Sequence, residues 1–390
     1  MVNKKIGLAI VYKYPDYGSM LQALATQLIL RDMGYESEAI NTDNLQSSIN
    51  RRKYKYFAEN IFDFSIVKEK SKIVWKKLRQ KFDKKFGGNQ RIRERAFERF
   101  NKTYFVESKA FVSWNGLSEN CSNNYDAVLV GSDQLWLPSN VEADYYTLSF
   151  VPDKVKKICY ATSFGIGAVP EKYSADYKRM LTRINFLSAR ETSGQRIIKD
   201  LTGRDAPLVC DPALLLNAEK WDAIATKDRV VKDKYVFCYF MGDNPEQRTF
   251  VRNLANKKNC KIVALLHLDQ YIASDGKYAD YAPYDVSPSD FINLIKNAEY
   301  VCTDSFHGTV FSIIYSKDFF TFRRFNKKAS LSTNTRLDSL LNRLNLSDRL
   351  YSAKEDVDSD FHISDYATIQ NRVSEFREES LKYLKTALGT

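Results

Sequence analysis

Short apolar segments that stop at a glycine or at a Ser-Asp turn alternate with helix-length segments along most of this sequence. The first apolar segment is "KKIGLAIVY", and the segment that follows at 19–35 has apolar residues at helical spacing and Gly34 at its predicted C-terminal end. The runs "DAVLV" and "KKICYATSFG" continue the pattern. Strands that alternate with helices favour a parallel sheet covered by helices. We therefore predict an α/β protein with functional loops at the carboxyl ends of its strands.

The alternation occurs twice, which divides the chain into two halves. It pauses at the polar segment "NAEKWDAIATKDRVVKDK" and restarts at "YVFCYFMGD". We predict an N-terminal domain at 1–215, a C-terminal domain at 235–365, and at 366–390 an amphipathic helix that packs back on the N-terminal domain. Further strands are predicted at "LSARE", "KIVALL", "EYVCTDS" and "DFFTFR", and a helix in "SPSDFINLIKNA" is predicted to be capped by Ser287 or Ser289.

The positive charge is concentrated in one segment of the N-terminal half. Residues 51–102 hold 18 Lys or Arg against 6 Asp or Glu, an excess of 12, whereas the whole chain has a net charge of +11. We predict a basic helical insertion here. The apolar residues expected on one side of its helix are Ile66, Val67, Ile73, Val74, Leu78 and Phe82.

Three roles remain open for this insertion: packing on its own domain as a solvated helix, peripheral contact with an anionic membrane, and binding of nucleic acid. Nucleic-acid proteins usually spread basic residues over a folded face and carry a recognisable motif. Because the excess of positive charge is confined to residues 51–102, we expect no nucleic-acid binding.

Membrane segments and cysteines indicate the cellular compartment. Every apolar run is far shorter than the roughly 20 residues that a membrane helix needs, and the first run is followed by "KYPDYG" rather than a cleavage site. We expect a cytoplasmic protein, with any membrane contact peripheral and at the inner face. The six cysteines are far apart without a Cys-x-x-Cys pair, so buried reduced thiols are expected rather than zinc or disulfides.

Four stretches carry most of the residues suited to chemistry. They are "YPDYGSMLQALATQLILRDMGYESEAI", "YDAVLVGSDQLW", "LSARETSGQRIIKDLTGRDAPLVCDPALLL" and "VCTDSFHGTVFSIIYSKDFFTF". In this order and spacing they resemble the polysaccharide pyruvyl transferase family, and "STNTRLDSLLNRLNL" fits the pattern that follows in many members. The resemblance implies two Rossmann-like domains arranged as in GT-B glycosyltransferases, with the active site in the cleft between them.

The resemblance also implies a reaction. Phosphoenolpyruvate is the donor, and the acceptor is a sugar of a capsule or exopolysaccharide repeat unit, including a lipid-linked oligosaccharide. Pyruvate becomes a cyclic ketal on the sugar and phosphate leaves, without a metal or another cofactor. Two alternatives remain open: a glycosyltransferase of GT-B type that uses a nucleotide sugar, since a fold does not determine a reaction, and a non-enzymatic basic adaptor that acts through residues 51–102.

His307 lies in "TDSFHGTVFSIIY" between a predicted strand and a predicted helix. Free backbone N–H groups and the positive end of a helix dipole at such a junction suit a phosphate or carboxylate. For pyruvyl transfer, His307 is predicted to be the catalytic group, because an imidazole gives and takes protons near neutral pH. The donor is predicted to contact Ser305, Gly308 and Thr309. The alternative for His307 is a buried residue that caps the helix.

Another cation must balance the donor. The better-studied branch of the family has an arginine two residues before the motif histidine, where this chain has Ser305. Arg190 in "LSARE" matches a family arginine that contacts the donor, and a guanidinium binds phosphate or carboxylate through two parallel hydrogen bonds. A salt bridge of Arg190 with Glu191 or Glu219 is the alternative. Arg336 in "TNTRLDSLL" is the candidate for the missing charge.

The acceptor is predicted to contact two strand-to-helix loops of the N-terminal domain. The first loop holds Tyr17, Gly18 and Gln22, and the second, "GSDQLW", holds Asp133 and Gln134. The side chains of the second loop are suited to hydrogen-bond sugar hydroxyls. For Asp133, a structural role in its own turn is the alternative.

Overall fold

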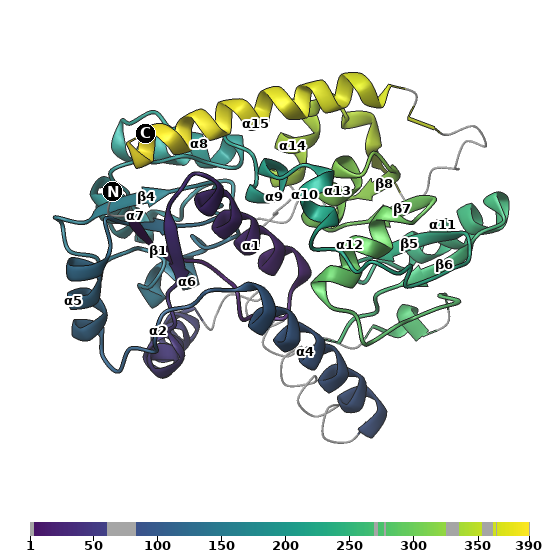
Figure 1. Ribbon diagram of the computed structural model, residues 1–390, viewed down its shortest axis with the longest axis horizontal. Helices are drawn as coiled ribbons and strands as arrows, with labels where there is room; N and C mark the ends of the chain where they lie inside the picture. Colours follow the sequence, from purple (N-terminus) through teal and green to yellow (C-terminus); the bar gives the residue numbers. More distant parts are fainter. Residues whose placement is uncertain are drawn as a thin grey trace.

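Two parallel β-sheets form the centres of two α/β lobes (Figure 1). The computed structural model describes residues 4–60, 83–268, 272–276, 278–324, 335–352, 362–363 and 365–389. The apolar helix face predicted at 66–82 lies outside these residues, as do positions 332–334 of the fifth motif.

The N-terminal lobe contains a four-stranded sheet in the order β2-β1-β3-β4. Its strands are β1 (Lys5–Ala9), β2 (Glu36–Ala39), β3 (Ala127–Val130) and β4 (Lys156–Cys159). The helices around them are α1 (Tyr17–Asp32), α2 (Gln46–Glu59), α4 (Lys84–Tyr104), α5 (Trp114–Asn124), α6 (Pro138–Ala143), α7 (Ser174–Arg183) and α8 (Thr192–Thr202). Every residue of β3 is buried, as expected for a parallel sheet with helices on both faces.

The C-terminal lobe contains a five-stranded sheet in the order β6-β5-β7-β8-β9. Its strands are β5 (Tyr235–Tyr239), β6 (Lys261–Ala264), β7 (Tyr300–Thr303), β8 (Asp318–Phe322) and β9 (Leu350–Tyr351), and its helices are α11 (Pro245–Lys258), α12 (Pro288–Lys296), α13 (Phe306–Ile314) and α14 (Thr335–Leu344). Ser287, rather than Ser289, caps α12, through a capping box with Asp290. Short helices α9 (Pro212–Leu215) and α10 (Ala218–Asp222) join the lobes.

The strand predicted at "LSARE" is wrong. Ala189 forms only an isolated bridge to Leu208. Along the edge of β4, backbone and side-chain bonds are mixed: the N–H of Cys159 donates to the carbonyl of Phe186 at 2.8 Å, whereas the N–H of Ala161 donates to Oγ of Ser188 at 3.1 Å. The chain therefore runs beside the sheet without forming a further strand.

Helix α15 (Tyr366–Leu388) runs along one side of the molecule from the C-terminal lobe to the N-terminal lobe (Figure 1, yellow). The hydroxyl of Tyr383 donates to the carbonyl of Cys159 at 2.8 Å, and Oγ of Ser380 accepts from the N–H of Cys210 at 2.9 Å. The end of the chain is thus anchored on the N-terminal lobe.

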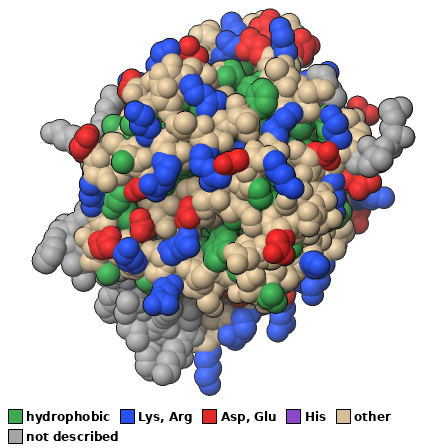
Figure 2. All heavy atoms as spheres, turned by 90° about the vertical axis from the view of Figure 1, so that its left-hand side faces the viewer, with side chains coloured by type: hydrophobic (Ala, Val, Ile, Leu, Met, Phe, Trp, Pro, Cys, Tyr) green, Lys and Arg blue, Asp and Glu red, His purple; other side chains and the backbone are tan. Residues whose placement is uncertain are grey.

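The described parts of the basic segment pack against the protein itself. Helix α2 packs on α6, and α4 reaches the C-terminal lobe, where Arg93 donates to the carbonyls of Leu266 at 2.9 Å and Pro283 at 3.0 Å. Phe97 of α4 is buried in the core. On the face of the N-terminal lobe that Figure 2 shows, Lys and Arg side chains are interspersed with Asp and Glu side chains.

The structure bears on two predictions, the absence of a membrane helix and the state of the cysteines. Among the described helices, none is both long and apolar enough to cross a membrane. All six cysteines lie in the described part of the chain as free thiols, five of them buried and Cys260 partly buried, as predicted. Burial raises the pKa of Cys210 to about 12, so this thiol stays protonated at neutral pH.

Candidate active site between the lobes

A cavity of about 550 Å³ lies between the two lobes. Its described lining comes from the loops that follow β1, β2 and β3 and from α1, α2 and α6 in the N-terminal lobe. In the C-terminal lobe it comes from the loops that follow β5, β7 and β8 and from α13 and α14. The lining residues with polar side chains suited to chemistry include Lys13, Asp16, Ser19, Lys53, Asp133, Gln134, Ser305, His307, Arg324 and Arg336. Parallel sheets bind ligands at the carboxyl ends of their strands, so both lobes present their binding edges to one space.

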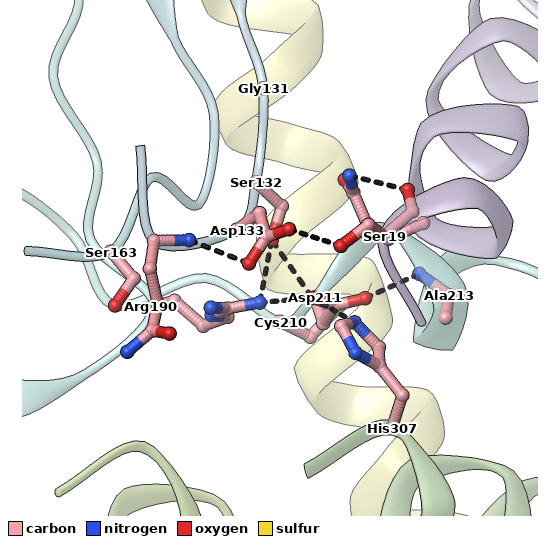
Figure 3. A network of polar contacts seen from close by, with 12 residues as sticks. Ser19, Gly131, Ser132, Asp133, Ser163, Arg190, Cys210, Asp211, Ala213 and His307 are labelled. Atoms are coloured by element: carbon pink, nitrogen blue, oxygen red, sulfur yellow. Dashed lines mark hydrogen bonds and ion pairs between the residues drawn. The ribbon is translucent and has the colours of Figure 1, made fainter. Parts of the chain in front are cut away.

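His307 is the second residue of α13, and its imidazole reaches across to the N-terminal lobe (Figure 3). Its Nε2 lies 3.3 Å from Oδ2 of Asp211, and 8% of its side chain is exposed. Ser305 caps α13, because its Oγ accepts from the N–H of Gly308 at 3.3 Å. The alternative in which His307 is the helix cap is therefore wrong, and its side chain lines the cavity.

Asp211 is the centre of the polar network in Figure 3. Its Oδ2 accepts from Nη1 of Arg190 at 2.6 Å and from Oγ of Ser132 at 2.8 Å, and its Oδ1 accepts from the N–H of Ala213 at 2.9 Å. Burial acts to raise the pKa of Asp211, but the positive charges of His307 and Arg190 outweigh burial and hold it well below the ordinary range. The charged carboxylate fixes the orientation of the imidazole.

Asp133 faces the same cavity from the loop after β3. Its Oδ2 accepts from Oγ of Ser19 at 2.5 Å, and its Oδ1 accepts from the N–H of Gln134 at 2.7 Å. Asp133 thus ties down its own turn while it lines the cavity. Burial acts to raise the pKa of Asp133, but the charge of Arg190, the hydrogen bond from Ser19 and the charge of His307 together lower it. An ionised carboxylate therefore lies near the imidazole.

Asp133 also adopts an unusual backbone conformation. Its φ of +89° lies in a region that residues other than glycine seldom occupy. Such strain persists only where the surroundings hold it, and it is common at functional sites.

Two arginines lie against the ring of Phe306 at one end of the cavity. The guanidinium carbon of Arg190 is 4.7 Å from the ring centroid, and that of Arg336 is 5.6 Å away. Within the described part of the chain, Nε and Nη2 of Arg190 and Nε of Arg336 are buried without a hydrogen-bond partner. Burial and the charge of Arg190 lower the pKa of Arg336 to about 9. An anion at this end would supply acceptors and reduce the repulsion between the guanidinium groups.

The three arginines of this region differ in their access to the cavity. Arg336 lines the cavity, whereas Arg190 lies behind Phe306 and pairs with Asp211 rather than with Glu191 or Glu219. Arg324, which follows β8, also lines the cavity. Arg324 was not among the predicted site residues, although its position directly after a predicted strand was a usable signal.

Tyr17 and Gln22 lie outside the described lining of the cavity. The hydroxyl of Tyr17 donates to the carbonyl of Val286 at 3.0 Å, and its ring stacks on Phe291 with centroids 4.8 Å apart. Nε2 of Gln22 donates to the carbonyl of Ser19 at 2.9 Å. Both side chains are buried, so the structure places them in the packing between the lobes and within α1 rather than at the predicted acceptor contact.

Gly308 and Thr309 also lie outside the described lining, in contrast to the predicted donor contact. A Cβ on Gly308 would lie 2.5 Å from Oγ1 of Thr303, so this glycine permits α13 to pack closely on β7. Oγ1 of Thr309 lies 2.8 Å from Oγ1 of Thr321 in the interior. Ser305 does line the cavity.

Gly18 provides the space that the imidazole of His307 occupies. A Cβ on Gly18 would lie 2.0 Å from Nδ1 and 2.4 Å from Cγ of His307. No side-chain rotamer relieves such an overlap, because the β-carbon position is set by the backbone. Gly18 lies in α1 and outside the described lining, so it affects the site through the position of His307 rather than through the predicted acceptor contact.

We expect Gly18→Ala to displace the imidazole of His307. The rate of the reaction catalysed in this cavity is expected to fall by about 100-fold, which is the effect of misplacing a reacting group by about 1 Å. The measurement is kcat, with thermal unfolding to show that the fold is retained. Gly88→Ala is the matched control, because Gly88 also lies in a helix and has open space where its Cβ would be. Equal rates in the two variants would contradict the assigned role of Gly18.

Comparisons with known proteins agree on the fold and the family. UDP-N-acetylglucosamine 2-epimerase from Rickettsia bellii is similar with a TM-score of 0.50 and 10% identity, over 99% of this chain and 97% of that chain. A putative UDP-N-acetylglucosamine 2-epimerase from Listeria monocytogenes has a TM-score of 0.50 and 12% identity, over 98% and 90% of the two chains. These similarities confirm the predicted GT-B-like α/β fold.

At the level of sequence, a search of curated proteins finds no match. The pattern that describes the polysaccharide pyruvyl transferase family matches residues 16–324, which is most of the chain and includes all of the four motifs except the first two residues of the first motif. The chain therefore belongs to the polysaccharide pyruvyl transferase family.

Proposed function

We propose that this protein transfers pyruvate from phosphoenolpyruvate to two hydroxyls of a surface-polysaccharide sugar, with formation of a ketal and release of phosphate. The observation that supports this most is the juxtaposition of His307 with Arg336 in one interlobe cavity. The first provides a proton donor that Asp211 holds in place, and the second provides a buried cation for an anionic donor.

The donor carries a phosphate and a carboxylate, both anionic. Arg336 and Arg324 line the end of the cavity where the N-terminus of α13 also points. A helix N-terminus and a guanidinium both favour such anions. In this proposal Arg336 supplies the charge that is missing at Ser305, and Arg190 supports the site from behind through Asp211.

The first half of the reaction forms one carbon–oxygen bond. Protonated His307 gives its proton to the methylene carbon of the enolpyruvyl group, which leaves positive charge on the neighbouring carbon. A sugar hydroxyl adds to that carbon and returns its proton to the neutral imidazole. Asp133, whose lowered pKa makes it a weak base, accepts a hydrogen bond from the hydroxyl and orients it.

The second half closes the ketal. The bond between the same carbon and the phosphate oxygen breaks, and phosphate leaves with the electron pair. The second sugar hydroxyl adds to the carbon, and its proton passes to the departing phosphate. Donor and diol are thus converted to ketal and phosphate, and His307 returns to its protonated state.

The test is incubation of the purified chain with phosphoenolpyruvate and a set of galactoside and mannoside acceptors. We expect phosphate release together with an acceptor product that has gained one pyruvate ketal by mass spectrometry. A chain that neither binds phosphoenolpyruvate nor releases phosphate, but is stabilised against heat by a nucleoside diphosphate, would contradict the proposal and favour the nucleotide-sugar alternative.

We expect Arg336→Leu to weaken phosphoenolpyruvate binding by roughly 10- to 100-fold, since a charge-assisted hydrogen bond contributes about 1.5–3 kcal/mol. Titration calorimetry measures this affinity directly. The matched control is Arg343→Leu on the same helix, because Arg343 pairs with Glu379 away from the cavity. If Arg336→Leu binds the donor as tightly as Arg343→Leu does, Arg336 is not the donor's cation.

A further inference from the structure

Much of the cavity lining comes from the N-terminal lobe, and we call this part of the lining the N-terminal arm. We define this N-terminal arm by six of its lining residues. They are Tyr12, Thr42, Gln46, Lys53, Asn140 and Tyr146. They come from the loops after β1 and β2, from α2 and α6, and from the segment after α6.

The N-terminal arm has a surface suited to a sugar. Tyrosine rings provide apolar faces with polar edges, and amide and hydroxyl groups provide hydrogen-bond partners. Burial and the charge of Asp133 raise the pKa of Tyr146, which agrees with its position in the lining beside Asp133. The arm therefore begins next to the carboxylate that orients the reacting hydroxyl in the proposed mechanism.

The two lysines that line the cavity differ in whether an acidic residue compensates their charge. Nζ of Lys13 lies 2.7 Å from Asp43 and 2.9 Å from Glu107, so its charge is compensated. Lys53 is half-buried and has no ion-pair partner within the described part of the chain. Burial lowers the pKa of Lys53.

An uncompensated ammonium group in a cavity is unfavourable unless a ligand brings an opposite charge. The other five residues that define the arm are uncharged polar or aromatic groups, whereas Asp43, which also lines the cavity, is paired with Lys13. The ligand that fits both features is a saccharide that carries a negative charge near the sugar ring.

We propose that the acceptor is an acidic saccharide: its sugar occupies the N-terminal arm, and an attached carboxylate or phosphate ester pairs with Lys53. This inference rests on the proposed function for the position of the reacting hydroxyls beside His307. It also assigns a task to the basic segment, since Lys53 belongs to residues 51–102. This cation of the segment selects the substrate from inside the cavity.

The test compares three probes that share one sugar: a neutral methyl glycoside, the corresponding uronic acid glycoside, and the corresponding sugar 1-diphosphate. Equilibrium binding to the whole chain is measured without donor. We expect at least one of the two anionic probes to bind about tenfold more tightly than the neutral glycoside, the effect of one charged contact. The two anionic probes distinguish a carboxylate from a phosphate ester as the source of the charge.

Two variants locate the effect at Lys53. Lys53→Gln is expected to abolish the preference for the anionic probe, and Lys53→Arg is expected to retain it. Lys55→Gln is the matched control, because it removes the same charge from the same helix at a residue that pairs with Glu59 and Glu142 outside this cavity. Added salt is expected to weaken anionic binding more than neutral binding.

The proposal is overturned if the neutral glycoside binds as tightly as both anionic probes, or if Lys53→Gln weakens all three probes equally. Because binding is measured without phosphoenolpyruvate, failure of the proposed function is distinguishable. In that case the preference for the anionic probe and its loss in Lys53→Gln persist, while no phosphate is released in the presence of donor.

Discussion

Replacement of His307 by alanine is expected to lower kcat for pyruvyl transfer by about 10²- to 10⁴-fold, the usual contribution of a general acid–base group. The imidazole has two observed constraints, Asp211 at Nε2 and Gly18 against Nδ1. Both hold the imidazole in one position at the cavity. Phosphate release measures kcat, and titration calorimetry measures donor affinity, which is expected to change far less.

His362→Ala is the matched control for this variant. His362 also lies in the C-terminal part of the chain, but 70% of its side chain is exposed and it pairs with Asp318. Its replacement is expected to leave kcat unchanged. Full activity of His307→Ala would contradict the catalytic assignment and favour the basic-adaptor alternative.

Replacement of Asp211 by asparagine is expected to lower the free energy of unfolding by about 3–5 kcal/mol, because it leaves the charge of Arg190 buried without its carboxylate. Both side chains of this pair are almost completely buried, at 1% and 0% exposure, with the two atoms 2.6 Å apart. Denaturant unfolding at neutral pH measures the change. Asp205→Asn, at a solvent-exposed ion pair with Lys199, is the control and is expected to have little effect.

The effect of Asp211→Asn is also expected to depend on pH. The pKa of Asp211 is held well below the ordinary value because the charges of His307 and Arg190 outweigh burial. A carboxylate with a depressed pKa in the folded state stabilises that state fully above its unfolded pKa of about 4, and this contribution is lost as the pH falls further. The stability difference between the natural chain and the variant should therefore shrink below about pH 4. A difference that stays constant down to pH 2 would contradict an ionised Asp211.

Much of the fold was predictable because apolar runs and helix-ending glycines are patterns of residues that lie close together in the sequence. The apolar runs at 4–12 and 126–130 became β1 and β3, and Gly34 has the positive φ of +83° expected at the end of α1. His307 was predicted at a strand-to-helix junction and lies there. The segment "LSARE" was misassigned because its apolar pattern does not show that backbone pairing here is limited to isolated bridges at Phe186 and Ala189.

The network around His307 was only partly predictable. Asp211 was present in the motif "APLVCDPALLL", and its position after an apolar run and before a proline was a signal for a helix cap. Its bond to His307 joins residues 96 positions apart in different lobes. Such a contact depends on how the two sheets meet, and residue periodicity does not specify this.

The amino-acid sequence by itself determined the alternation of strands and helices, the family and the junction that holds His307, because each depends on residues that are close together in the chain. Only the tertiary structure decided that Asp211 holds the imidazole, that Gly18 leaves room for it, and that Lys53 of the basic segment faces the cavity. The physical reason is that burial and charge compensation are properties of a three-dimensional neighbourhood, and this neighbourhood forms when the two lobes pack together.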